Sequence, residues 1–150
     1  MYKRKRTNRK SIQSVKTEVD GIKFASSLEA YMYRALKKAK IKAVYEGEQF
    51  VLIDGFVFEA SSMERSGRRE YLDKEGTKIL PVKYTPDFVG EEFIIECKGR
   101  ANEAFPMRWK LFKKWMQENR PGISLYKPQN QKDCDATIEA ILKKRKEKDK

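Results

Sequence analysis

Apolar residues recur at helical spacing in three parts of the chain. The first part predicts an amphipathic helix over Ser27–Lys40 with Ser26 as its N-cap, because Leu28, Met32, Ala35, Leu36 and Ala39 share one face. A second helix is expected to begin at Pro106 and to end before Pro121-Gly122. Its predicted apolar face comprises Met107, Leu111, Phe112, Trp115 and Met116. The third predicted helix spans Asp135–Lys148.

Shorter apolar runs predict strands between these helices. Residues 42–58 contain several such runs, broken by Gly47 and Asp54-Gly55. The polar segment 61–78 predicts a loop or a protruding hairpin. Two strand-like runs over 79–89 and 92–98 follow, separated by Gly90-Glu91, and 123–126 predicts a last short strand. This order of elements favours an α/β or α+β fold with a central mixed β-sheet flanked by helices.

Charge divides the 150 residues into a nearly neutral body and two basic ends. The net charge is +12. The first ten residues contain no acid and six basic side chains, Lys3, Arg4, Lys5, Arg6, Arg9 and Lys10, and the last eight contain six more against two acids. We therefore expect a flexible basic N-terminal arm over 1–17 and a single domain over 18–150 with a basic C-terminal helix. Basic ends of this kind favour a nucleic acid as partner over a membrane surface.

Composition excludes several classes of chemistry. The chain contains no histidine, so Ser-His-Asp catalysis and zinc sites that combine cysteine with histidine are ruled out. Two cysteines are too few for a disulfide framework. No apolar run exceeds four residues, far short of the roughly 20 needed to span a bilayer. We expect a soluble cytoplasmic protein with no membrane partner.

The segment most suggestive of chemistry runs from Tyr84 to Gly99. Glu96 and Lys98 stand two positions apart on a predicted strand, so their side chains should share one face. In a hairpin with a four-residue loop Asp87 lies directly opposite Glu96, whereas with a two-residue Gly90-Glu91 loop it becomes the diagonal neighbour. In either register two carboxylates and an ammonium group converge.

Two converging carboxylates suit Mg²⁺ or Mn²⁺, which prefer oxygen ligands. Lys98 beside such a metal could hold an attacking water or neutralise charge on a phosphate, which suits phosphodiester hydrolysis without histidine. The alternative is ordinary sheet surface, since alternating Glu and Lys is common on the solvent face of an edge strand. Spacing alone leaves both interpretations open.

Three ordered blocks of sequence resemble a known group of enzymes. These blocks are Thr17–Phe24 with Ser27-Leu28-Glu29-Ala30, then Tyr84–Phe88, then Glu96-Cys97-Lys98-Gly99. They resemble the PD-(D/E)xK nuclease superfamily, and in particular small bacteriophage endonucleases related to endonuclease I-type Holliday-junction resolvases. The resemblance covers roughly residues 15–127, although the segment 58–78 is longer and more polar than that pattern.

The resemblance implies a restriction-endonuclease-like core and a Mg²⁺-dependent endodeoxyribonuclease of a phage in its bacterial host, acting on branched DNA in recombination or replication. It implies Asp87 and Glu96 as metal ligands, Lys98 as the catalytic lysine and Glu29 as a further site residue. The backbone carbonyl of Cys97 could complete the metal shell, while its side chain should point into the core. Resolvases of this type often form intertwined dimers, which leaves a homodimer open.

Glu29 has an alternative role. Ser26 to Glu29 also match a capping box, in which the glutamate at the third helical position reaches back to the backbone before the helix. A carboxylate held in this way could not also serve well as a metal ligand.

Further basic residues could contact DNA phosphates. They comprise Arg100, directly after the motif, and Lys110, Lys113 and Lys114 on the polar side of the second predicted helix. These lysines could equally form a solvated helix face above an apolar core. The alternative to a nuclease is a non-catalytic nucleic-acid-binding protein in which the basic ends provide the affinity.

Overall fold

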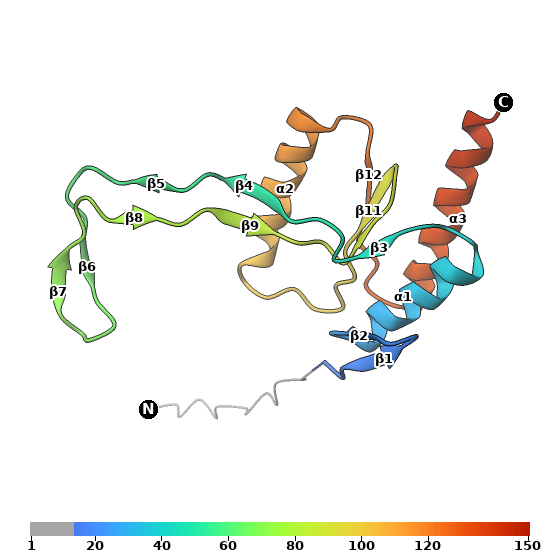
Figure 1. Ribbon diagram of the computed structural model, residues 1–150, viewed down its shortest axis with the longest axis horizontal. Coiled ribbons are helices and arrows are strands. Elements are labelled where there is room, and N and C mark those ends of the chain that lie inside the picture. The colour runs from blue at the N-terminus through green and yellow to red at the C-terminus, as the bar shows by residue number, and fades with distance from the viewer. Residues whose placement is uncertain (1–13) are drawn as a thin grey trace, which may run out of the picture.

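The computed structural model describes residues 14–150, which are built around a four-stranded mixed sheet (Figure 1). Its strand order is β12 (Ser124–Tyr126), β11 (Phe93–Ile95), β10 (Phe88–Val89) and β3 (Val44–Tyr45). The β11–β12 pair is parallel and the other two pairs are antiparallel. Together with three helices, this sheet confirms the α+β class expected from the sequence.

Helices cover both faces of the sheet. Phe93 and Ile95 of β11 belong to one buried cluster with residues of α1 (Ser27–Lys38) and α3 (Gln131–Lys148). Ile94, between them, belongs to a second cluster with aromatic residues of α2 (Phe105–Asn119). All three residues of β11 are buried, as expected for a central strand with helices on both sides.

The helix boundaries differ from the predictions at several ends. α1 begins at Ser27 with Ser26 as N-cap, as predicted, but ends at Lys38 rather than Lys40. α3 begins at Gln131, four residues before the predicted start, because the Asn130 side chain accepts a hydrogen bond from the Asp133 amide. In α2 the predicted apolar face is wrong at Met107, whose side chain is 64% exposed.

A hairpin that the sequence analysis missed precedes α1. Strands β1 (Thr17–Val19) and β2 (Ile22–Phe24) pair across Asp20-Gly21, both of which have positive φ angles. Asp-Gly is a strong signal for a two-residue hairpin turn. Thr17, the last residue of the predicted N-terminal arm, therefore belongs to β1 instead. The predictions for residues 1–13 lie outside the described residues.

The segment between β3 and β10 forms a long two-stranded extension, which we call the β-ribbon (residues 51–80; Figure 1). Next to the body, β4 (Phe50–Ile53) pairs with β9 (Val82–Tyr84), which follows the ribbon in the sequence. Further out, β5 (Phe56–Val57) pairs with β8 (Lys78–Ile79). At its tip β6 (Met63–Arg65) pairs with β7 (Tyr71–Asp73), so the protruding-hairpin alternative is confirmed.

The continuous strand predicted over 79–89 is wrong. The structure divides it among β8, β9 and β10, with Pro81 and Pro86 at the interruptions. Proline has no amide N–H to donate to a neighbouring strand, so these two residues break the pairing. After the second break, Asp87 directly precedes the tight hairpin formed by β10 and β11.

Replacing Gly90 by alanine is expected to destabilise the fold by about 2 kcal/mol. A Cβ atom at this position would lie less than 3 Å from the ring of Phe93, which is itself only 2% exposed. Chemical denaturation measures the loss. Gly67→Ala is the matched control, since a Cβ there meets nothing within 4 Å, and an equal effect of both substitutions would contradict the packing argument.

Candidate active site

Asp87 and Glu96 lie opposite each other just beyond the end of the β10–β11 hairpin. The pairs Phe88–Ile95 and Val89–Ile94 establish the register of the four-residue loop, so the diagonal alternative is wrong. Two backbone contacts hold Asp87 from either side. Its Oδ2 accepts a hydrogen bond from the Cys97 amide at 2.6 Å, and its carbonyl accepts one from the Glu46 amide at 2.7 Å.

The backbone of Glu96-Cys97-Lys98 remains extended beyond the end of β11. The amides of Glu96 and Lys98 donate to the carbonyls of Tyr126 and Pro128, each at 2.9 Å, which continues the pairing with the chain after β12. Alternation along this extended backbone places Glu96 and Lys98 on one face. The distance from Lys98 Nζ to Glu96 Oε1 is 4.0 Å. The Cys97 side chain faces the opposite way, into the buried cluster that contains Phe93 and Ile95, as predicted.

Tyr84 is a member of the site that sequence analysis missed. Its hydroxyl donates a hydrogen bond of 2.6 Å to Glu96 Oε2, and both side chains are buried. The tyrosine therefore orients one oxygen of Glu96 while the other faces Lys98. Nothing in the local spacing indicated this contact, because Tyr84 comes from β9 at the base of the β-ribbon.

Glu29 makes hydrogen bonds of the kind that the capping alternative predicts. Its amide donates to Ser26 Oγ at 3.2 Å, and its Oε1 accepts from the same hydroxyl at 2.8 Å. Its Oε2 accepts from the Ala25 amide at 3.1 Å and from the Tyr45 hydroxyl at 2.6 Å. Both oxygens are thus engaged at the helix start, and a metal-binding role for Glu29 stays a prediction.

Replacing Ser26 by alanine is expected to lower the free energy of unfolding by about 1 kcal/mol, because the Glu29 amide loses its acceptor. Urea denaturation measures this loss. Ser27→Ala, at the exposed neighbouring position, is the matched control and should change stability by only a few tenths of a kcal/mol. Indistinguishable unfolding curves for Ser26→Ala and wild type would contradict the claim that the Ser26 cap stabilises α1.

Half-buried Asp87 and buried Glu96 both have raised pKa values. Burial is the largest cause that raises the pKa of Asp87, to about 8, and the negative charges of Glu96 and Glu29 add to it. Burial likewise raises the pKa of Glu96, although Tyr84 and Lys98 oppose this change. A nearby cation would favour the charged forms of both carboxylates.

The oxygen atoms at this site supply only some of the ligands that a divalent cation needs. Within residues 14–150, no three Asp, Glu or Cys side chains converge closely enough to form a complete metal site. Mg²⁺, however, is commonly held by one or two carboxylates, with water and substrate phosphate supplying the other ligands. Asp87 and Glu96, with the Cys97 carbonyl as a further oxygen, would be the protein's contribution.

Two clefts meet at Lys98. One, of about 350 Å³, is lined by Glu96 and Lys98 together with Lys83, Asn102, Phe105 and Arg108. The other, of about 610 Å³, lies on the Glu29 side and is lined by Ser26, Cys97, Gly99 and Arg100. Lys83 and Arg108 were not predicted as site residues, since neither belongs to the motif and only folding brings them to this cleft.

The predicted DNA-binding residues have different surroundings. Arg100 lines the second cleft, close to the motif. On α2, Lys113 lies 5.9 Å from the centre of the Trp109 ring and Lys114 forms an ion pair of 3.8 Å with Glu118, while Lys110 is exposed. Lys3, Arg4, Lys5, Arg6, Arg9 and Lys10 lie outside the described residues.

The fold and the site define an α+β protein in which half-buried Asp87 and buried Glu96 lie beside a lysine at the end of a central hairpin. The chain belongs to the family described as "Protein of unknown function (DUF1064)", whose model matches residues 9–127. No curated protein and no solved structure matches the chain. In the described part of the chain, no helix combines the length and apolar character needed to cross a membrane.

Proposed function

We propose that this protein is a Mg²⁺- or Mn²⁺-dependent DNA endonuclease that hydrolyses phosphodiester bonds, with branched DNA such as a Holliday junction as its preferred substrate. The observation that carries the proposal is the convergence of Asp87, Glu96 and Lys98 at the end of one hairpin. Glu96 and Lys98 line the smaller cleft, and Lys98 also lines the larger one. The branched-DNA preference rests on the sequence resemblance alone.

Each side chain has a distinct part in the proposed reaction. Asp87 and Glu96 would hold the metal, which when bound polarises the scissile phosphate. Tyr84 and the Cys97 amide keep the two carboxylates oriented, so little reorganisation is needed when substrate binds. Lys98, 4.8 Å from the centre of the Phe105 ring and open to the cleft, would orient the attacking water and offset charge that develops on the phosphate.

Basic residues around the cleft support a polyanionic substrate. Lys83 and Arg108 line it beside Glu96, and Lys127 lies 5.8 Å from the centre of the same Phe105 ring. Such contacts position a phosphate backbone without selecting a base sequence. A DNA substrate of phage replication or recombination would place this activity in the cytoplasm of the bacterial host.

A gel assay of purified wild-type protein tests the proposed class. A four-way junction, a linear duplex and a single strand are each incubated with Mg²⁺ and with chelator. We expect cleavage only with Mg²⁺, and fastest on the junction. Binding that is insensitive to chelator, without cleavage of any substrate, would instead favour the non-catalytic nucleic-acid-binding alternative.

A further inference from the structure

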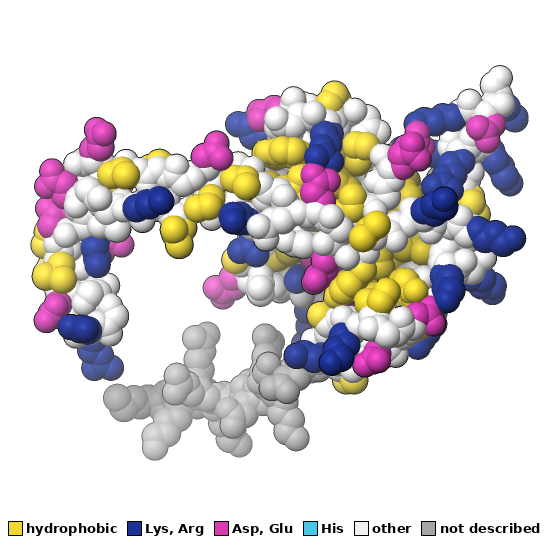
Figure 2. Space-filling view, in the orientation of Figure 1, with side chains coloured by type: hydrophobic (Ala, Val, Ile, Leu, Met, Phe, Trp, Pro, Cys, Tyr) yellow, Lys and Arg dark blue, Asp and Glu magenta, His cyan; other side chains and the backbone are white. Residues whose placement is uncertain are grey.

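Positive charge in the described chain is concentrated at the ends of two helices. α1 ends in Lys37-Lys38 and is followed by Lys40, and residues 143–150 at the end of α3 contain six basic residues against two acids. Residues 37–40 and 143–150 contribute net charges of +3 and +4, whereas the remainder of residues 14–150 carries −1. Figure 2 shows basic side chains gathered along α3. We call these two segments the basic end.

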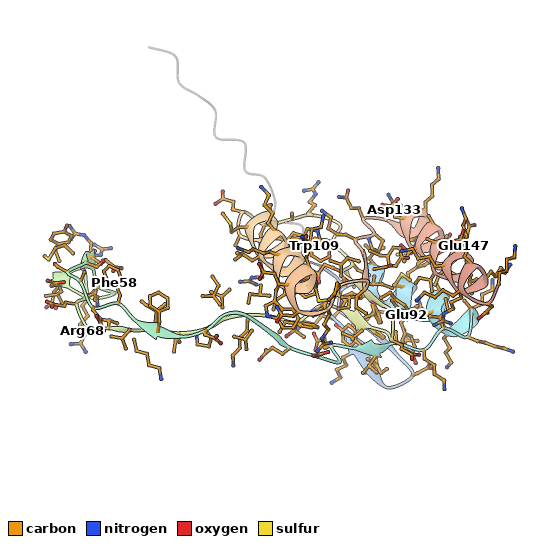
Figure 3. All side chains as sticks on the ribbon, turned by 90° about the horizontal axis from the view of Figure 1, so that it is seen from above. Phe58, Arg68, Glu92, Trp109, Asp133 and Glu147 are labelled. Atoms are coloured by element: carbon orange, nitrogen blue, oxygen red, sulfur yellow. The ribbon has the colours of Figure 1, made fainter. Side chains whose placement is uncertain are left out.

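The two segments form one surface. α1 and α3 pack against each other, and residues of both helices belong to the same buried cluster. A cleft of about 680 Å³ at their ends is lined by Lys40 on one side and by Arg145 and Lys148 on the other. In Figure 3, Glu147 marks this end of α3, far from Phe58 in the β-ribbon.

This surface lies away from the active site, at the other end of the same elements. α1 begins beside the larger active-site cleft, which Ser26 and Glu29 line, and its twelve residues span about 18 Å. β11 provides a second measure, because Glu92 lines the cleft at the basic end and Glu96 belongs to the active site. These two residues are four positions apart, or about 13 Å along an extended chain. The basic end therefore cannot contact the phosphate that is cut.

Most of the charge of the basic end is not neutralised by the fold. Within residues 14–150, only Lys37 and Lys148 of this surface form ion pairs, with Asp20 and Glu92. When Glu92 and its neighbour Glu91, which also line the cleft, are counted, the net charge is still +5. The cations without an ion pair in this part of the chain are Lys38, Lys40, Lys143, Lys144, Arg145, Lys146 and Lys150.

Helix dipoles do not account for this excess. The C-terminus of a helix carries about half a negative charge, so the ends of α1 and α3 together offset about one unit of +5. The remaining like charges repel one another and weaken the fold. A polyanion bound at this surface would remove that repulsion.

The composition of the basic end favours duplex DNA among polyanions. Eight of its nine cations are lysines, which are depleted at protein–protein interfaces. Membrane-surface helices need a broad apolar face, whereas the exposed large hydrophobic side chains that adjoin this surface are only Val44 and Leu142. Single strands bind by stacking on aromatic rings, but the exposed Phe and Tyr side chains of the described chain lie on the β-ribbon.

We propose that the basic end is a second DNA-binding surface, which holds duplex DNA by its phosphate backbone away from the site of cleavage. The choice of DNA over RNA rests on the proposed function. Contacts from lysine to phosphate carry no base preference, so this surface anchors the protein on a duplex of any sequence.

Fluorescence anisotropy with a labelled duplex, in chelator so that nothing is cleaved, tests this proposal. The triple variant Lys40→Ala/Lys143→Ala/Lys146→Ala should bind the duplex at least about 10-fold more weakly than wild type. The slope of log affinity against log salt should become shallower by about 2 to 3, because each lost phosphate contact reduces it by about 0.9.

The matched control removes three exposed lysines from other parts of the fold. Lys23→Ala/Lys78→Ala/Lys132→Ala has the same net charge as the first variant and should bind within about threefold of wild type. Equal loss in both triple variants, or no loss in either, would overturn the proposal. So would tighter binding of duplex RNA, or of vesicles rich in phosphatidylserine, than of duplex DNA.

Chemical acetylation of the wild-type protein provides a second measurement that needs no variant. Duplex DNA in chelator should protect Lys40, Lys143 and Lys146 from acetylation, read by mass spectrometry, more than it protects Lys78 and Lys132. Equal protection of all five lysines would contradict the proposal. Because neither measurement involves cleavage, a protein that cuts DNA but has no such surface is distinguished from one that binds DNA here and does not cut it.

Discussion

Replacing Lys98 by alanine is expected to lower the rate of Mg²⁺-dependent DNA cleavage by about 10³-fold. The ammonium group lies beside Glu96 and faces a cleft, so its loss removes the group that orients water and offsets charge at the phosphate. DNA affinity should change by less than about threefold, since many other basic residues contribute to it. Single-turnover cleavage and filter binding measure the two quantities.

The exposed Lys42, remote from the motif in sequence, supplies the matched control for Lys98. Lys42→Ala removes the same charge and should leave the cleavage rate within about twofold of wild type. A Lys98→Ala protein that keeps more than a tenth of wild-type cleavage would show that this lysine does not take part in the chemistry.

Replacing Asp87 by asparagine is expected to stabilise the metal-free protein by about 2 kcal/mol at pH 8. Burial and the neighbouring acids raise the pKa of Asp87 to about 8, so the folded protein binds a proton here more tightly than the unfolded chain does. The resulting loss of wild-type stability begins above the unfolded pKa near 4 and grows until about pH 8. Asparagine carries no charge and avoids this loss.

Urea denaturation at pH 4 and pH 8 measures the effect, which should be small at pH 4. Added Mg²⁺ should stabilise wild type at pH 8 but not Asp87→Asn, because the variant lacks one of the two carboxylates. Glu91→Gln removes an exposed acid from the same hairpin and should change stability by less than 0.5 kcal/mol. A destabilised Asp87→Asn protein at pH 8 would contradict the electrostatic account.

Local patterns in the sequence predicted the parts of the site that depend on one hairpin and one helix start. Strand alternation placed Glu96 and Lys98 together. It also put Asp87 on the same face as Glu96, while the choice between a four-residue and a two-residue loop was left open, and the structure has the four-residue loop. The capping box likewise depends on residues three apart, and the structure has it at Ser26 and Glu29. Short-range geometry of this kind follows from the backbone alone.

The contacts that orient the acids could not be predicted in the same way. Tyr84 reaches Glu96 from β9, and Tyr45 reaches Glu29 from β3, each across a different strand of the fold. Arg108 comes to the cleft from the first turns of α2. These positions depend on how helices and strands pack, which no pattern of neighbouring residues encodes.

The most direct test of the central claim compares cleavage by wild type, Asp87→Asn and Glu91→Gln on one DNA substrate, each with Mg²⁺ and with chelator. If Asp87 helps to hold the catalytic metal, wild type and Glu91→Gln cleave with Mg²⁺, chelator stops both, and the folded Asp87→Asn protein does not cleave. Normal Mg²⁺-dependent cleavage by Asp87→Asn, or no cleavage by any of the three proteins, would contradict the account.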